Sequence, residues 1–251
     1  MIFFSKPSTI HVDCFTYNEM ALLTAPIERA SRYMPEWFKT LSASIDIPNV
    51  VFPAPTMKYC AGVVDYYAKS IGLPLWSDLA IKIENREYYW KYSDSESIAM
   101  LHDKLQYPGY LEGSNYGHLK LMSPWSIQTK EDTAWMFSQP LYNYNTVRDF
   151  SVLPGVINFK HQPATHVQMM IDLSKDKKFV IPLGELLANI TPLTDKKIKL
   201  HRHLVTIEEF KRIDRRKSLP VTFIDKYKTL IKRKKEFSDC PYTNRTKDYS
   251  K

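Results

Sequence analysis

The pair His201 and His203 is the best starting point for metal chemistry, because it is the only His-x-His in the chain. Alternate residues of a strand point to the same face, so both imidazoles could reach one metal ion. A nearby carboxylate would complete the two-histidine, one-carboxylate site of a non-heme iron enzyme. The surrounding segment, KKIKLHRHLV, is basic throughout and disfavours a bound cation. We therefore expect an exposed basic edge strand with no metal, and the metal site is the alternative.

Catalytic side chains of other kinds have weaker support. Asp65, Asp78 and Glu185 lie within apolar stretches, where a carboxyl group can acquire the shifted pKa that general acid–base catalysis needs. Cys60 follows Lys58 by two residues, and a positive neighbour can activate a thiol. For each carboxylate the favoured role is a turn cap or an ion pair, and for Cys60 it is that of a small buried residue. No catalytic residue is assigned.

Two tryptophans are candidates for contact with a ligand or a partner: Trp76 in PLWSD and Trp125 in SPW. An indole can stack on a sugar, a base or another protein, and the alternative is packing in the core or at its rim. The chain contains neither a GxGxxG nor a GxxxxGK[ST] sequence. These motifs cradle phosphates, so their absence argues against a nucleotide-binding α/β fold, and we expect no cofactor.

Composition favours a strand-rich globular protein. Of the 251 residues, 44% are hydrophobic and 13% aromatic, and only 7 are glycine. Short runs of β-branched and aromatic residues, separated by Pro, Asn and Asp, are typical of strands. The three cysteines are far apart and odd in number, which predicts a reducing compartment rather than a disulfide framework. No apolar run approaches the length of about 20 residues that crosses a membrane, so no membrane partner is expected.

Charge is distributed unevenly along the chain. Residues 195–251 contain 18 Lys and Arg against 8 Asp and Glu, a balance of +10, whereas residues 1–194 carry −2. Such asymmetry is typical of an electrostatic interaction surface, with nucleic acid or an acidic protein as its partner. A solvated tail that only improves solubility is the alternative.

Local patterns predict the elements of the first half of the chain. Alternation over residues 9–16 predicts a strand. A proline in the first turn predicts a short helix over 35–41, with Trp37 and Phe38 on its buried side, followed by an extended connector over 42–55. Further predictions are a helix over 62–70 ended by Gly72, a hairpin that turns across 84–87, and a short helix and loop within 93–117.

The second half of the body reads as strands in quick succession. Strands are predicted in 118–129, 132–143, 153–160, 166–173 and 177–193. We expect a mainly β (α+β) fold, with a β-sandwich or jelly-roll-like body over residues 1–195 and a basic, mainly helical tail over 196–251. Residues 9–193 are expected to share one core, which includes Val156, Ile157, Met169, Ile171, Val180, Ile181, Leu187 and Ile190.

The tail has two helical patterns separated by Pro220. Thr206 and Glu209 form a capping box at the start of the first helix. The second segment, residues 221–235, has an apolar stripe at helical spacing, made of Phe223, Ile224, Tyr227, Leu230 and Ile231. Its basic side chains are the expected partner-binding residues: Lys226, Lys228, Lys232, Arg233, Lys234 and Lys235.

Several segments resemble a family of uncharacterised proteins from tailed bacteriophages, especially marine ones, and related bacterial domains of unknown function. The segments are YMPEWFKTL (33–41), TMKYCAGVVDYYAKSIGLPLWSD (56–78), HLKLMSPW (118–125), QPLYN (139–143), LPGVINFK (153–160) and FVIPLGELLANITPL (179–193). Leu186 departs from the family, which usually has proline there. The resemblance implies a phage gene product and, by analogy only, a jelly-roll or β-clip turn near Gly184. The family carries no established activity, so no functional residue follows from it.

These observations support one leading hypothesis and two alternatives. The leading hypothesis is a non-enzymatic phage structural or interaction protein, associated with the virion or with its assembly. Its partners are other virion proteins or further copies of itself, and its location is the virion or the host cytoplasm. The first alternative is a small-ligand-binding or metal-dependent jelly-roll enzyme. The second is a protein that binds nucleic acid through its basic tail.

Overall fold

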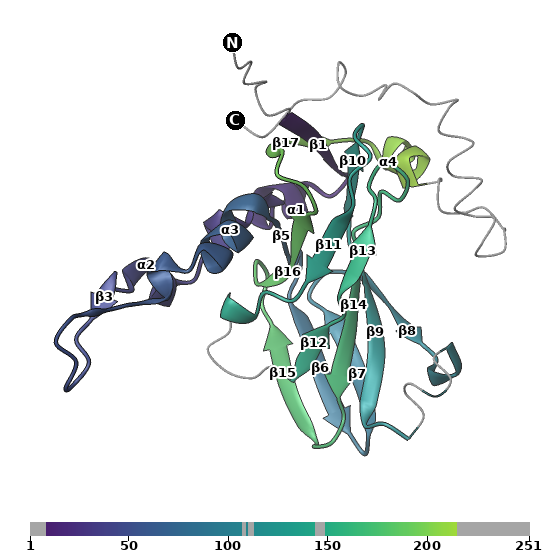
Figure 1. The fold of residues 1–251 in the computed structure, drawn as a ribbon. Helices are drawn as coiled ribbons and strands as arrows, with labels where there is room; N and C mark the ends of the chain where they lie inside the picture. The colour runs from purple at the N-terminus through teal and green to yellow at the C-terminus, as the bar shows by residue number, and fades with distance from the viewer. Residues whose placement is uncertain (1–8, 107–108, 110–112, 144–148, 215–251) are drawn as a thin grey trace, which may run out of the picture.

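The chain folds mainly into β-strands that form several antiparallel sheets, with a few short helices (Figure 1). This computed structural model describes residues 9–106, 109, 113–143 and 149–214. The expected fold class, a mainly β, sandwich-like body with short helices, is confirmed. No helix within these ranges is both long and apolar enough to cross a membrane.

The first sheet brings both ends of the described chain together. Its order is β10 (Trp125–Thr129), β1 (Thr9–Thr16), β17 (Lys197–Leu204). Strands β1 and β17 run parallel and pair over all eight residues, from Thr9 opposite Lys197 to Thr16 opposite Leu204. The predicted boundary between residues 195 and 196 therefore falls just before a strand that pairs with the body. The predicted exposed edge strand is confirmed in position, since β17 is the outer strand of this sheet among the described residues, but the prediction is wrong in exposure at His203, which is 4% exposed.

The remaining strands form four sheets. The largest has the order β13 (Gly155–Ile157), β11 (Trp135–Ser138), β16 (Leu186–Pro192), β5 (Ile71–Pro74), β2 (Glu28–Arg29). The next has the order β12 (Phe150–Val152), β14 (Val167–Asp172), β9 (Tyr116–Met122), β8 (Ile98–His102). The last two are β15 (Lys177–Ile181), β6 (Leu79–Glu84), β7 (Glu87–Tyr92), and the pair β3 (Ser44–Ile45), β4 (Ala54–Pro55).

Short helices connect the sheets. The α-helices are α1 (Glu19–Thr24), α2 (Glu36–Thr40), α3 (Ala61–Lys69) and α4 (Ile207–Asp214). The 3₁₀ helices are η1 (Ala30–Tyr33), η2 (Met57–Tyr59), η3 (Lys104–Gln106) and η4 (Leu141–Asn143). The helix predicted over 35–41 is confirmed as α2, and the hairpin across 84–87 as β6–β7. Asn85 and Arg86 both have positive φ, as two-residue hairpin turns of type I′ require.

Two local predictions are wrong for physical reasons. Gly72 does not end a helix: α3 ends at Lys69, and Gly72 lies inside β5. A Cβ built at Gly72 would lie 2.5 Å from Tyr33 Cδ2, so the glycine makes room for a tyrosine ring. The helix and loop expected in 93–117 include a strand, β8, whose short apolar run IAML pairs with β9.

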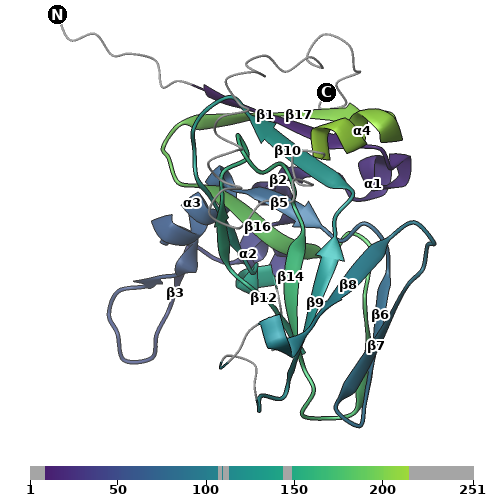
Figure 2. The same ribbon diagram turned by 90° about the vertical axis from the view of Figure 1, so that its right-hand side faces the viewer.

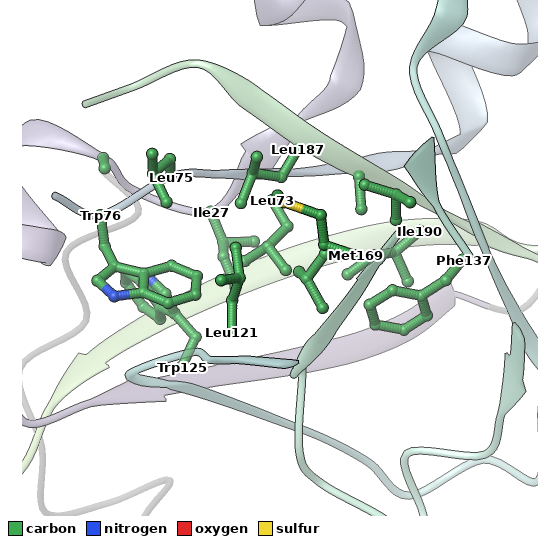
Figure 3. Packing of buried hydrophobic residues seen from close by; sticks show 14 of the residues in the cluster. Ile27, Leu73, Leu75, Trp76, Leu121, Trp125, Phe137, Met169, Leu187 and Ile190 are labelled. Carbon is green, nitrogen blue, oxygen red and sulfur yellow. The ribbon is translucent and has the colours of Figure 1, made fainter. Parts of the chain in front are cut away.

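One large core joins four of the five sheets, all but the β3–β4 pair, and Figure 3 shows part of its packing. Five of the eight predicted core residues belong to it: Met169, Ile171, Ile181, Leu187 and Ile190. Ile157 is partly buried and packs against the cluster. The prediction is wrong for Val156 and Val180, which are 64% and 58% exposed. Val156 and Val180 each neighbour a core-facing residue on the same strand. Because successive side chains of a strand point to opposite faces, these two valines point away from the core.

Candidate interaction surface

A projecting arm is the most distinctive surface feature of the molecule. We define the arm as residues 36–69, which contain α2, β3, β4, η2 and α3. Figure 1 shows these elements extending away from the sheets of the body, with β3 farthest out, and in Figure 2 the loop at β3 again lies outside the sheets. The segment 42–55, which the sequence presents as an extended connector, is the outer part of this arm and turns back on itself.

The root of the arm has its own small apolar cluster. Ala30, Phe38, Val63 and Tyr67 are buried together, and Met34 and Tyr66 pack against them. Phe38 is buried as predicted, but Trp37 is 36% exposed, and its indole Nε1 donates a hydrogen bond to the Tyr142 carbonyl at 2.9 Å. Trp37, which neighbours Phe38 of this cluster, thus ties the root of the arm to a different part of the chain.

Tyrosine hydroxyls attach the same root to the large sheet and to η4. The Tyr67 hydroxyl donates to Asn143 Oδ1 at 2.7 Å, and the Tyr66 hydroxyl lies 3.2 Å from Ser138 Oγ on β11. Burial raises the pKa of both phenols above the usual value, so both stay neutral at any physiological pH. The arm therefore projects from an anchored base.

A lysine side chain caps the C-terminus of α2, the first helix of the arm. Lys58 donates hydrogen bonds from Nζ to the carbonyls of Phe38 and Lys39, at 3.0 and 2.8 Å. Its ammonium also lies 5.5 Å from the centre of the Phe38 ring. A cation at a helix C-terminus satisfies carbonyls that have no partner within the helix. Lys58 thus joins the outgoing and returning chains of the arm. Its ammonium group is bound by the carbonyls and the ring of the arm itself.

The tip of the arm is a tight turn that exposes apolar side chains. Val50 N donates to the Ile47 carbonyl at 3.1 Å, and Asn49 has φ = 67°. With Pro48 before it, this is the pattern of a type II turn, which needs positive φ at its third residue. The side chains around the turn are exposed as follows: Ile45 49%, Ile47 41%, Val50 53%, Val51 88% and Phe52 78%. We call these five residues the arm tip.

Such a surface is suited to binding another macromolecule. Apolar side chains that follow one another in the chain and remain exposed mark interaction sites more often than scattered single ones do. Asp46 is the only ionisable residue between Leu41 and Lys58, so burying the tip desolvates little charge. The sequence signal was present in the uncharged run IPNVVFPAP, but a run of this kind is equally typical of a buried strand.

The histidines predicted as an alternative metal site lie on one face of β17. The rings of His201 and His203 have centroids 6.5 Å apart and are nearly parallel, so they point the same way, as predicted. His201 Nε2, however, lies 3.0 Å from His11 Nδ1, and those two rings are stacked. His203 Nε2 lies 2.9 Å from Asp13 Oδ1. The two imidazoles thus have different partners.

The Asp13–His203 pair is shielded by α4. Both residues are at least nine-tenths buried, and the Phe15 ring stacks on His203 at 4.8 Å. Phe210 and Ile213 of α4 pack in the same cluster as Phe15. Across the described ranges, no three His, Cys, Asp or Glu side chains are placed to hold a metal ion. The pair therefore joins β1 to β17. Through the Phe15 ring, it also supports the packing of α4.

The two candidate tryptophans lie in the core. Trp76 is 4% exposed and Trp125 is fully buried, and both belong to the large apolar cluster (Figure 3). Trp76 also stacks near Tyr92, with centroids 6.5 Å apart. Their burial favours the packing role over contact with a ligand or partner.

The other candidate side chains are spread over the surface. Asp65 pairs with Lys69 at 2.9 Å, and Asp78 Oδ1 accepts a hydrogen bond from Leu183 N at 2.7 Å, the structural roles expected of them. Glu185 lies in the turn before β16 and its side chain is half-buried. The expectation that Cys60 is buried is wrong: it precedes α3 and is exposed. The structure does not bring these four residues into one site.

The tail predictions are tested only in part. The capping box is confirmed: Glu209 N donates to Thr206 Oγ1 at 3.2 Å, and Thr206 N donates to Glu209 Oε2 at 3.1 Å. Residues 215–251 lie outside the described ranges. The predicted break at Pro220, the second helical segment and its basic residues lie among them: Lys226, Lys228, Lys232, Arg233, Lys234 and Lys235.

Comparison with known proteins adds no relative: no family model, curated protein or solved structure matches this chain.

Proposed function

We propose that this protein is a non-enzymatic interaction protein that takes part in building a bacteriophage particle, in the virion or during its assembly in the host cytoplasm. The observation that carries the proposal is the arm, which has an anchored root and an exposed apolar tip. The resemblance of six segments to tailed-phage proteins supplies the context.

The arm supports a binding role because its energetics favour insertion into a partner. Full burial of a Val, Leu, Ile or Phe side chain contributes about 1.5–3 kcal/mol. Val51 and Phe52, 88% and 78% exposed, would gain most of this on binding. The root is already ordered by hydrogen bonds and apolar contacts, so less conformational entropy is lost when the tip is buried. Burial of the tip against a partner would therefore stabilise the complex.

The test is mass spectrometry of purified particles and assembly intermediates from the phage that encodes the chain. The wild-type protein should be present in one of them. The double variant Val51→Asp, Phe52→Asp places two charges at the tip. This variant should be absent from the particles and intermediates that contain the wild-type protein. Val156→Asp is the control, because Val156 is an apolar residue of the body that is 64% exposed, and this variant should be retained.

Two results would contradict the proposal. Absence of the wild-type protein from both particles and intermediates would refute a role in the particle. Retention of the arm variant at the level of the control would show that the arm tip is not the binding element.

A further inference from the structure

Strand β8 forms an open edge of its sheet. It is the outer strand in the order β12, β14, β9, β8, and within the described residues it pairs with β9 alone. Figure 1 shows it beside β9, at the right-hand margin of the body. All five residues of β8 pair with β9 without a bulge, so the edge is regular along its whole length. The backbone groups that point outward from such an edge are a template for another strand.

The other outer strands of the described chain have the protection that edges usually have. Charged residues lie on β7, β15 and β17. β2, β3, β4, β12 and β13 contain only two or three residues each. All of β10 is buried, and Ile127 N of that strand donates a hydrogen bond to the Pro163 carbonyl at 2.7 Å. By contrast, β8 is five residues long, largely exposed, and free of Lys, Arg, Asp and Glu.

Apolar side chains are exposed on both faces of β8. Ile98 and Met100 share one face and are 58% and 49% exposed. On the other face, Ala99 packs against the core, whereas Leu101 is 58% exposed. A strand that is added to an edge continues the pleat and places its side chains beside those of the edge on both faces. One added strand would therefore contact all three exposed side chains.

The pattern of side chains fits a second β8 in antiparallel orientation. A twofold axis at Met100 pairs the whole strand with its copy and places the two Met100 residues opposite each other. Ile98 of one copy then lies opposite His102 of the other. On the second face, the small Ala99 lies opposite the larger Leu101, so the two copies fill this face without crowding.

Charge at the ends of the strand favours the antiparallel over the parallel orientation. Glu96 precedes β8 by two residues, and Asp103 and Lys104 follow it. In a parallel pair, each carboxylate would lie opposite its own copy, and like charges opposite each other destabilise a strand pair. The antiparallel register instead brings position 96 of one copy opposite position 104 of the other, and so pairs a Glu with a Lys.

We propose that two copies of this chain pair through β8, antiparallel and about a twofold axis at Met100, and so join two four-stranded sheets into one continuous sheet. Each copy contributes the same surface, so the contact is closed at two copies. This dimer is a property of the isolated protein and does not rest on the role proposed for the arm. Figure 1 shows the arm on the opposite side of the body from β8, so both arm tips stay accessible in the dimer.

Disulfide trapping in the full-length chain tests the register. The background carries Cys60→Ser and Cys240→Ser, which leaves the buried Cys14. Met100→Cys should give a disulfide-linked dimer under mild oxidation, because directly opposite residues of antiparallel strands have Cα atoms about 4.5–5.5 Å apart, within disulfide range. Ile98→Cys is the matched control. Its copy lies four residues away along the pair, about 13 Å at about 3.3 Å per residue, so it should stay unlinked.

Sedimentation equilibrium of the reduced protein measures the dimer itself. The wild-type chain should have twice the mass of one chain at micromolar concentration. Ile98→Lys should weaken the dimer severalfold, because a lysine protects natural edge strands from pairing. Val180→Lys is the matched control, since Val180 is also 58% exposed but lies on β15, and it should leave the dimer unchanged. Thermal unfolding checks that both variants are folded.

Three results would overturn the proposal. The first is a wild-type protein that stays monomeric at every concentration. The second is a dimer that Ile98→Lys, when folded, weakens no more than Val180→Lys does. The third is equal trapping of Met100→Cys and Ile98→Cys, which would indicate a parallel pair or an undirected contact. If Ile98→Lys does not fold, the comparison of the two cysteine variants decides.

Discussion

Gly117 on β9 shows how closely an aromatic ring can pack on a strand that lacks a side chain. A Cβ built there would overlap the Tyr88 ring, whose hydroxyl donates to the neighbouring His118 carbonyl at 2.8 Å. Burial raises the pKa of Tyr88 to about 12, so the phenol keeps its proton and remains a donor. The glycine is thus required for packing rather than for an unusual φ.

We predict that Gly117→Ala destabilises the protein by about 1–3 kcal/mol, the usual cost of overpacking a core. Gly155→Ala is the matched control, because nothing lies within 4 Å of a Cβ there. Urea unfolding of both variants measures the difference. Equal midpoints for the two variants would mean that the Tyr88 ring moves aside freely.

His118 is a buried histidine in the same region. Its Nε2 lies 2.8 Å from Gln168 Oε1, and its ring stacks on His102 at 4.6 Å. Burial lowers the pKa of His118, with smaller lowering by His102 and Lys120 and partial opposition from the Gln168 hydrogen bond. The folded protein therefore disfavours protonated His118.

This shift makes stability depend on pH. Because the folded pKa lies below the unfolded value of about 6.5, the unfolded chain binds the proton first, and stability falls as pH drops below that value. One such group changes stability by at most about 1.4 kcal/mol per pH unit. His118→Gln should reduce the loss of stability between pH 7 and pH 5, measured by thermal unfolding. An unchanged loss in this variant would place the origin at other groups, such as His161, whose pKa is also lowered by burial.

At the level of elements, α4 shows what a local sequence signal can and cannot predict. The capping box marks the start of the helix, because both partners lie within four residues. The packing of Phe210 and Ile213 on Phe15 depends on β1, almost 200 residues away in sequence. The capping box predicted the helix, but it could not predict the surface that the helix covers.

We expect Phe210→Ala to lower the free energy of unfolding by about 3 kcal/mol, the lower end for a buried phenylalanine, because Phe210 keeps 9% exposure. Ile207→Ala removes a side chain that is 43% exposed on the same helix and should cost about 0.5 kcal/mol or less. Chemical denaturation at one temperature compares the two variants. A small effect of Phe210→Ala would show that α4 contributes little to the body.

Element prediction succeeded where the information is local and failed where it is not. The hairpin β6–β7 was predictable because alternation and turn residues lie side by side in the sequence. Strand β8 was missed because its apolar run is short and its partner strand begins only at Tyr116. The arm tip was missed as a surface because exposure of Val51 and Phe52 depends on what the rest of the chain leaves uncovered.

For the molecule as a whole, the joining of its two ends is the feature least accessible from sequence. Composition changes after Pro192, which predicts a separate basic tail, yet Ile198 of β17 belongs to the large core. Arg202 of β17 also pairs with Glu28 of β2 at 2.7 Å. Charge patterning therefore predicted a boundary where tertiary pairing continues, because the pattern of charged residues carries no information on strand partners.

Two truncations test how far the body extends. A chain that ends at residue 214 keeps every described contact of β17 and α4, and should unfold cooperatively with a midpoint close to that of the full-length protein. A chain that ends at residue 195 loses α4 and the parallel partner of β1, and it uncovers Asp13 and Phe15. The deletion also removes Ile198 from the large core and the apolar contacts of Phe210 and Ile213, and such losses are large beside the total stability of a typical domain, about 5–15 kcal/mol. The shorter chain should therefore lose its cooperative transition in calorimetry. If it instead melts like the full-length protein, residues 1–195 are an independent unit, and the composition change after Pro192 marks a true domain boundary.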